Sequence, residues 1–124
     1  MQYVGHIEFA ITSRAPEQVT AEMPIQAGIL NPFGTVHAGA TLWFADVTAT
    51  HLVLEGRDPT AGMVGFPLAI NLSANLAGNQ ADGVFTAVAR YVKRGRSVSI
   101  VRTTVTGHGE RLIADVTTSH VASK

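Results

Sequence analysis

The sequence contains no cysteine among its 124 residues, which excludes disulfide bonds and thiolate chemistry. It also carries no net charge, since nine Lys and Arg residues balance nine Asp and Glu residues. Nucleic acids and anionic membranes attract proteins that have a strong positive field, so neither is an expected partner. No apolar run is long enough to span a membrane, and the N-terminus MQYVGHIEFAITS lacks the basic head and apolar stretch of a signal peptide. These absences predict a soluble, cytoplasmic protein.

Motifs of several common enzyme classes are absent as well. The sequence has no Walker motif, no dinucleotide-binding glycine pattern and no Gly-x-Ser-x-Gly segment. Four histidines have no metal-ligand spacing, and without cysteine a zinc site is not expected. They are His6, His51, His108 and His120. We therefore predict neither a metal nor a cofactor.

One long apolar segment stands out among shorter segments of alternating polarity. Residues 7–12 and 19–23 alternate, which predicts two short strands separated by the turn RAPEQ. After the breaker-rich loop QAGILNPFGT, residues 38–54 contain one charged side chain, that of Asp46, and stop signals follow in EGRDP. This pattern predicts a helix that is apolar on nearly all sides. Such a helix is normally packed on several sides, so we expect the strands to wrap it.

The second half of the chain predicts four more strands. Alternating polarity covers residues 68–76 and 85–91, and the turns KRGRS and GHGE delimit strands at 98–106 and 111–121. Strands joined in this way are typical of an antiparallel meander. The length fits one domain, 1–124, and repeats and linkers are absent. We predict an α+β domain in which a curved antiparallel sheet of about six strands surrounds one long central helix.

The start of this helix is the most informative place in the sequence. Its free N–H groups and its dipole form a site for a carbonyl oxygen that acquires negative charge. Ala38 and Gly39 are small, so a ligand can approach the first turn closely. Asn31 and His37 flank this turn, and each can orient a ligand, a water molecule or the loop backbone by hydrogen bonding.

Asp46 is an ionisable group in a segment where water is expected to be scarce. An unpaired buried carboxylate is costly, so such groups are retained mainly when they are paired or functional. Two structural explanations stay open: a pair with a buried arginine, and a position at a solvent-facing edge. Thr50 follows one helical turn later, close enough to bond the Asp46 carboxylate or a shared water molecule.

The pattern of Asn31, Gly34, His37, Gly39 and Asp46 resembles that of the hotdog-fold acyl-CoA thioesterases of the phenylacetate-degradation (PaaI) type. The resemblance covers essentially the whole chain, and the predicted strand order is similar. It implies a hotdog fold and hydrolysis of an acyl-CoA or aryl-CoA thioester. It also implies self-association, as a homodimer and further as a homotetramer that is a dimer of dimers.

The resemblance implies a role for each site residue. The backbone N–H of Ala38 is expected to polarise the thioester oxygen, next to Gly39. Asp46 is expected to act as nucleophile or general base. Asn31 is expected to position the carbonyl or the attacking water, and His37 to hold the geometry of the loop.

Two positions depart from the family pattern. The family commonly has glycine in place of Ala38, although the backbone donor survives this change. Some relatives use Ser or Thr on the strand after the helix, where this chain has Leu68, and Thr50 is the alternative. Structural explanations also stay open for two of the loop residues: Asn31 precedes a proline and suits a turn, and His37 suits a helix cap.

A basic turn lies between two of the predicted strands. Arg90, Lys93, Arg94 and Arg96 are candidates to bind the phosphates of coenzyme A. A solvated hairpin tip is the alternative, because cations are common at such turns. Trp43, on the apolar helix, is expected in the core or a subunit contact rather than in a substrate site.

The spacing along the helix has a geometric consequence. Ala38 and Asp46 are eight residues apart, which separates them by roughly 12 Å along a helix axis. One thioester carbonyl cannot contact both groups, so the two are expected to act on one substrate from different chains related by a two-fold axis. Two other functions stay open: a hotdog-type acyl-CoA hydratase or dehydratase, and a non-catalytic acyl-CoA-binding module.

Overall fold

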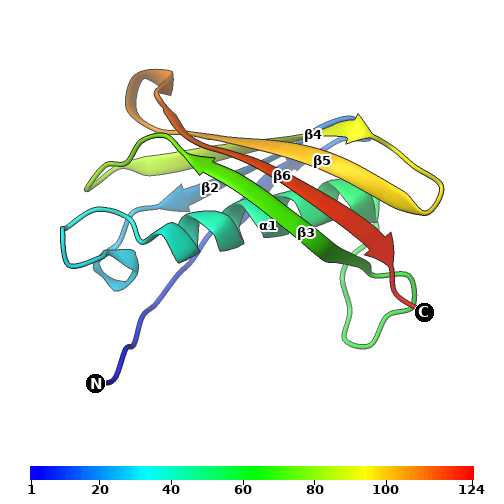
Figure 1. The fold of residues 1–124 in the computed structure, drawn as a ribbon, viewed down its shortest axis with the longest axis horizontal. Coiled ribbons are helices and arrows are strands. Elements are labelled where there is room, and N and C mark those ends of the chain that lie inside the picture. The colour runs from blue at the N-terminus through cyan, green and yellow to red at the C-terminus, as the bar shows by residue number, and fades with distance from the viewer.

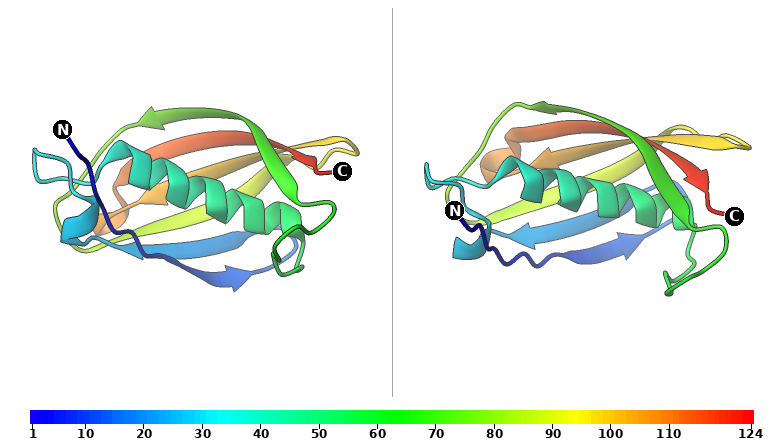
Figure 2. Two further views of the ribbon diagram at one scale, coloured as in Figure 1. Left: turned by 90° about the horizontal axis from the view of Figure 1, so that it is seen from below. Right: turned by 60° about the horizontal axis from the view of Figure 1, so that its bottom comes forward.

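A six-stranded antiparallel sheet curves around one long helix in the computed structural model of the protein, which describes residues 1–124 (Figure 1). In chain order the elements are β1 (Ala10–Arg14), β2 (Val19–Pro24), the short 3₁₀ helix η1 (Ala27–Ile29), α1 (Ala38–Leu54), β3 (Pro67–Leu76), β4 (Val84–Lys93), β5 (Val98–Thr106), η2 (His108–Glu110) and β6 (Leu112–Ala122). Figure 2 shows α1 lying along the hollow face of the sheet. The predicted fold class is therefore confirmed.

The sheet order is β1-β2-β4-β5-β6-β3. Strands β4, β5 and β6 form the expected meander, but β3 pairs with β6 instead of β4, so this part of the prediction is wrong. The physical reason is the course of α1, which packs against all six strands and carries the chain from the β2 side to the far edge of the sheet (Figure 2). Alternating polarity indicates that a strand exists and does not specify its partner.

Helix α1 begins and ends where its sequence signals predict. His37 is the N-cap residue, and its extended backbone (φ −62°, ψ 134°) precedes the first helical residue. At the other end Glu55 and Gly56 both have positive φ (50° and 82°), a conformation that stops a helix. Strand β1, in contrast, begins at Ala10 rather than Ile7, because the residues before it leave the sheet and cross toward η1.

The core forms between one face of α1 and the hollow face of the sheet. Phe44, Ala45 and Ala49 of the helix are fully buried against strand residues of the same face, which include Ala87 and Ala89. Small side chains on both sides let the helix approach the sheet closely. The sheet covers only this face, so the expected wrapping is partial, and Trp43 on the opposite side is half exposed.

Strand β3 is an unpaired edge with an apolar surface. Leu68, Ile70, Leu72 and Leu76 are exposed, by 58% in the case of Ile70. Free backbone N–H and C=O groups next to exposed apolar side chains form a template for another strand.

No helix of the protein has the length and apolar character needed to cross a membrane.

Candidate active site

The loop before α1 is held in place by two asparagines. The Asn31 Oδ1 atom accepts hydrogen bonds from the N–H groups of Phe33 (3.0 Å) and Thr35 (3.2 Å). Asn79, which the sequence reasoning missed, binds both backbone groups of Val36, at 3.1 Å to the nitrogen and 2.8 Å to the oxygen. Asn31 therefore has the contacts of a turn-forming residue, which is the structural role that its position before a proline suggested.

His37 caps the helix through its side chain. Its Nδ1 atom accepts a hydrogen bond of 2.9 Å from the Gly39 N–H, which leaves the ring hydrogen on Nε2. A Cβ atom at Gly39 would lie 3.1 Å from this Nδ1, so glycine fits the cap best. These contacts are those of a residue that holds the loop.

Ala38 contributes the free N–H of the first turn. The N–H groups of Ala40 and Thr41 donate to the His37 carbonyl, and that of Gly39 donates to the His37 ring. The Ala38 N–H makes no hydrogen bond within the protomer, and the residue is exposed. A single unpartnered donor at the positive end of the helix dipole is suited to an anionic oxygen.

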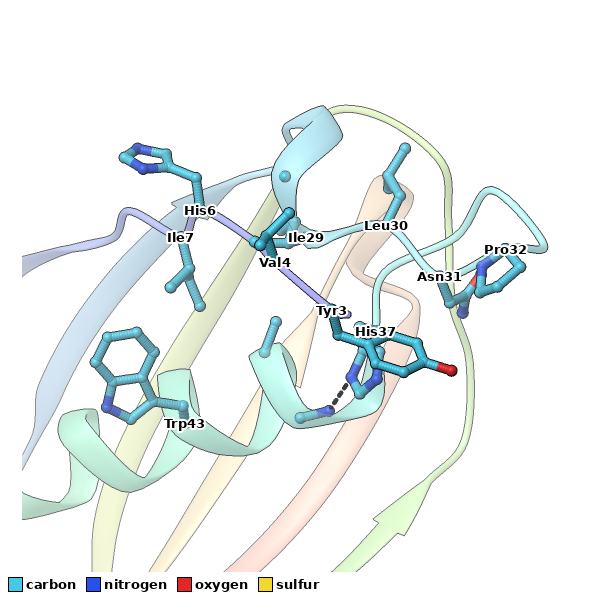
Figure 3. A pocket seen from close by; sticks show the side chains of 14 residues that line it. Tyr3, Val4, His6, Ile7, Ile29, Leu30, Asn31, Pro32, His37 and Trp43 are labelled. Atoms are coloured by element: carbon cyan, nitrogen blue, oxygen red, sulfur yellow. Dashed lines mark hydrogen bonds between the residues drawn. The ribbon is translucent and has the colours of Figure 1, made fainter. Parts of the chain in front are cut away.

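A cavity of about 700 Å³ opens at this helix start (Figure 3). Its polar end is formed by Asn31, His37 and Gly39. The rest is mainly apolar, and its walls include Ile29, Leu30, Trp43 and residues 3–7 of the N-terminal segment. The volume is that of a small-molecule site.

Asp46 lines a second cavity, of about 450 Å³, together with Trp43, Thr50, His51 and Leu68. Its Oδ1 atom is buried and has no hydrogen-bond partner, and the carboxylate forms no ion pair. The alternative that Asp46 is the ion-pair partner of a buried arginine is therefore wrong. Burial raises the pKa of Asp46 above the ordinary carboxyl value, and the nearby His120 opposes this shift.

Thr50 does not bond the Asp46 carboxylate as expected. Its hydroxyl donates to the backbone carbonyl oxygen of Asp46 at 2.9 Å. A threonine inside a helix commonly satisfies its hydroxyl in this way, which turns it away from a side chain one turn earlier. The spacing in the sequence correctly placed Thr50 near Asp46, but it did not show that the backbone carbonyl oxygen of Asp46 would compete with the carboxylate for the hydroxyl.

His120 on β6 is a buried neighbour of this site that the sequence reasoning missed. Its Nδ1 atom lies 3.3 Å from the carbonyl oxygen of Pro67 and its Nε2 atom 2.8 Å from the Thr118 hydroxyl. Since a carbonyl only accepts, the ring hydrogen is on Nδ1. Burial lowers the pKa of His120, which favours the neutral form of the ring in the fold. The alternation Val116, Thr118, His120 is the sequence signal that could have predicted this inward position.

A pH effect on stability follows from two histidines. Burial lowers the pKa values of both His51 and His120 below their ordinary 6.5. The unfolded chain then binds more protons than the fold as pH falls below about 6.5, so stability is lost in that range. The contribution of Asp46 to this pH dependence has the opposite sign, because its raised pKa stabilises the fold as pH falls.

We expect the free energy of unfolding to decrease between pH 7.5 and pH 5.5, measured by urea denaturation. The His120→Gln variant should show a smaller decrease in this free energy than the wild-type protein. The His6→Gln variant is the control at an exposed position, and its decrease should equal that of the wild-type protein. An unchanged slope in His120→Gln would show that this ring does not titrate with folding.

The residues of the basic turn differ in their surroundings. Arg94 forms ion pairs with Glu55 (3.1 Å) and Glu17 (3.4 Å), and its guanidinium lies 4.5 Å from the centre of the Tyr91 ring. It therefore connects the β4–β5 turn to the end of α1. The other three, Arg90, Lys93 and Arg96, form no ion pair.

The two halves of the candidate site open into different cavities of one protomer. Trp43 lines both cavities and lies between the helix start and Asp46 along α1. Asn31, His37 and Gly39 line the first cavity, and Asp46 and Thr50 line the second; Ala38 is at the helix start but lines neither. This separation is the one that the helical spacing predicted.

Comparisons with known proteins give a fold relationship. No protein-family model matches the sequence, and no curated protein matches it. A mutant thioesterase from Staphylococcus aureus superposes with a TM-score of 0.85 at 22% identity, over 94% of this chain and 93% of its own. A hypothetical thioesterase from Streptococcus pneumoniae with coenzyme A gives 0.81 at 17% identity, over 94% and 86%. A Streptococcus mutans protein bound to acetyl-CoA gives 0.82 at 19% identity, over 94% and 89%. The chain therefore has the hotdog fold of these structures.

Proposed function

We propose that the protein hydrolyses an acyl-CoA or aryl-CoA thioester to the free acid and coenzyme A. The observation that carries this proposal is the half-buried carboxylate of Asp46, whose Oδ1 atom is buried and has no partner, on the same helix as the exposed, free Ala38 N–H. Leaving a buried polar group without a partner is costly unless a ligand or a reaction uses it. The thioesterases of similar fold, and the coenzyme A and acetyl-CoA in two of the solved structures, support the same substrate class. The phenylacetate-degradation type is our choice among such enzymes.

In the proposed reaction the Ala38 N–H hydrogen-bonds to the thioester oxygen and stabilises the negative charge that develops on it. The Asp46 carboxylate either removes a proton from water, which attacks the carbonyl carbon, or attacks that carbon itself. The C–S bond then breaks, and the electron pair leaves with the coenzyme A sulfur. In the second route water hydrolyses the resulting anhydride. The raised pKa of Asp46 makes it a stronger base than an ordinary carboxylate, which assists both routes.

The complete site is proposed to form between two copies of the chain. The unpaired apolar edge of β3 supports a two-fold dimer, because two such edges pair antiparallel and remove their exposed surface. Leu68 of this edge lines the Asp46 cavity, so the interface lies beside the carboxylate. Antiparallel α1 helices would bring Asp46 of one copy to the Ala38 N–H of the other. Pairing of two dimers into a tetramer is proposed from the family resemblance alone.

A hydratase with the same fold is the second candidate. His51 lines the Asp46 cavity and its buried Nδ1 atom has no partner, so a second acid or base is present near the carboxylate. His120 is less suited to this role, since both of its ring nitrogens are bonded.

The purified protein should be incubated with a panel of acyl-CoA esters and a thiol-reactive dye, while binding is followed by calorimetry. Only hydrolysis releases a free thiol. Dye reaction with at least one ester supports the proposed function. An enoyl-CoA consumed without thiol release would instead indicate a hydratase, and binding without any turnover a non-catalytic module.

For the basic turn we expect different effects from neighbouring arginines. Arg96→Ala should raise KM for a CoA ester about threefold or more and leave KM for the corresponding pantetheine thioester unchanged, because only the CoA ester carries nucleotide phosphates. Arg94→Ala should mainly lower Tm, since it removes the contacts to Glu17, Glu55 and Tyr91. Equal KM effects of Arg96→Ala on both substrates would favour a solvated hairpin tip.

A further inference from the structure

Phe33 is a large apolar side chain that its own protomer leaves unpacked. It is 90% exposed, in the loop between η1 and α1. Figure 1 shows this loop extending beyond the start of α1 at one end of the molecule. A single exposed apolar residue is common on protein surfaces, so the way in which the loop presents this ring decides its significance.

The Phe33 turn, defined as residues 31–34, is held by hydrogen bonds on both sides of the ring. The Gly34 N–H donates to the Asn31 carbonyl at 2.9 Å, which closes a β-turn with Pro32 and Phe33 at its centre. The Phe33 N–H donates to Asn31 Oδ1 at 3.0 Å, and the Asn31 N–H donates to the Thr35 carbonyl at 2.8 Å. The backbone is thus fixed before any contact forms, and a pre-organised apolar side chain binds at a reduced entropic cost.

The Asp46 cavity offers a complementary apolar surface. Its lining extends from Asp46 toward the end of α1, where Leu54, Pro59 and Phe66 contribute, and it contains no lysine or arginine. Leu68 of the unpaired β3 edge lines the same cavity, so the cavity is continuous with the surface proposed for the dimer. An aromatic ring suits such a lining.

Helix geometry places the loop of one copy at this end of the cavity of the other. When the Ala38 N–H of one copy faces Asp46 of the other, two antiparallel α1 helices are in register about Leu42, midway between positions 38 and 46. The chain that precedes Ala38 then lies beside the part of the other α1 that follows Asp46. This part of the helix carries the apolar end of the cavity.

We propose that Phe33 of one copy enters the Asp46 cavity of the other, closes its apolar end and thereby limits the length of the acyl group. This inference rests on the proposed function, because it uses the register of the shared site. The occupant is a second copy of the chain, since the Phe33 turn and Pro59 of one protomer lie beyond opposite ends of α1, a helix of 17 residues or roughly 25 Å. A ring at the end of an apolar cavity excludes water and shortens the space left for a ligand.

Cross-linking tests the placement of Phe33 without any turnover. The chain has no cysteine, so introduced thiols react selectively. We expect a short bismaleimide reagent to join Phe33→Cys/Pro59→Cys chains into covalent dimers, seen by denaturing electrophoresis, because the two positions are too far apart to link within one chain. Each single variant should link at least about tenfold more slowly. So should Phe33→Cys/Thr12→Cys, a matched control whose second thiol is exposed on β1, at the opposite edge of the sheet from β3.

Binding to the Asp46→Asn protein tests the limit on acyl length. In this background Phe33→Ala should lower the ratio of Kd for dodecanoyl-CoA to Kd for acetyl-CoA about tenfold or more, because the freed space buries additional methylene groups. Phe33→Leu, the matched control, keeps an apolar side chain in the cavity and should change this ratio less than about threefold. Calorimetry measures both values of Kd, and circular dichroism and sedimentation establish that the variants are folded dimers. Loss of the dimer in Phe33→Ala would itself support the contact, and Phe33→Val then replaces it in the binding measurement.

Two results would overturn the assignment of Phe33. One is a double variant with cysteine at positions 33 and 59 that links no faster than the single variants. The other is a folded dimer without the Phe33 ring whose ratio of Kd values is unchanged. Failure of the proposed function is recognised separately, because the covalent dimer would form and acyl-CoA would bind while wild-type protein releases no thiol from any ester.

Discussion

The Asp46→Asn variant should fold and lose at least about a hundredfold in thioester hydrolysis. The substitution keeps the size of the side chain and removes its charge and basicity, which both proposed routes require. Steady-state thiol release from the ester that wild-type protein hydrolyses best measures the effect. Glu22→Gln is a suitable control, because Glu22 is an exposed carboxylate without an ion pair and should be replaceable at little cost in rate.

The same variant should be more stable than the wild-type protein at neutral pH. Burial raises the pKa of Asp46, so the ionised carboxylate opposes folding above that pKa, and the effect disappears as pH falls below the unfolded value of 3.8. We expect Tm to rise by about 2–4 °C at pH 7.5 and by less at pH 4. A lost activity with a lower Tm would indicate a structural role, and a folded variant with nearly wild-type turnover would exclude Asp46 from catalysis.

The pH dependence of the hydrolysis rate should also reflect the raised pKa of Asp46. If ionised Asp46 is the base or nucleophile, kcat/KM rises with pH through the raised pKa of this group. Its acid limb should then lie above the range of an ordinary carboxyl group.

The sequence predicted the parts of the fold that depend on local signals. The helix at 38–54 was correct at both ends, because His37 caps one end and a glycine follows the other. Alternating polarity located the strands to within a few residues. The position of β3 at the sheet edge was not predictable in the same way, since its pairing with β6 depends on where α1 delivers the chain.

In the candidate site, too, features set by local sequence were predictable, and features that depend on contacts in the folded chain were not. The separation of Ala38 from Asp46 follows from helical rise, since both residues lie on α1. The partners of Thr50 and Arg94 did not follow from spacing, because each side chain found a competitor: a backbone carbonyl in one case and two glutamates in the other. Asn79 supports the loop from the β3–β4 connection, a contact that only the folded chain creates.

A mixture of two inactive variants should recover activity if the site is shared between chains. Asp46→Ala removes the carboxylate. Ala38→Pro removes the free backbone donor, and it is compatible with the structure because proline suits the first helical position and His37 already has the extended conformation that a following proline requires. Ala38→Gly keeps the donor and should stay active, which makes it the control for a change at this position.

Each variant alone contains no complete site, whereas a mixed dimer contains one: the Ala38 N–H of the Asp46→Ala chain faces Asp46 of the Ala38→Pro chain. Random pairing after co-refolding makes half of the dimers mixed, and one of their two sites is intact, so about a quarter of wild-type activity should return. Native mass spectrometry measures the fraction of mixed dimers. If mixed dimers form and stay inactive while both variants fold normally, Asp46 and the Ala38 N–H do not act on one substrate across the two-fold axis.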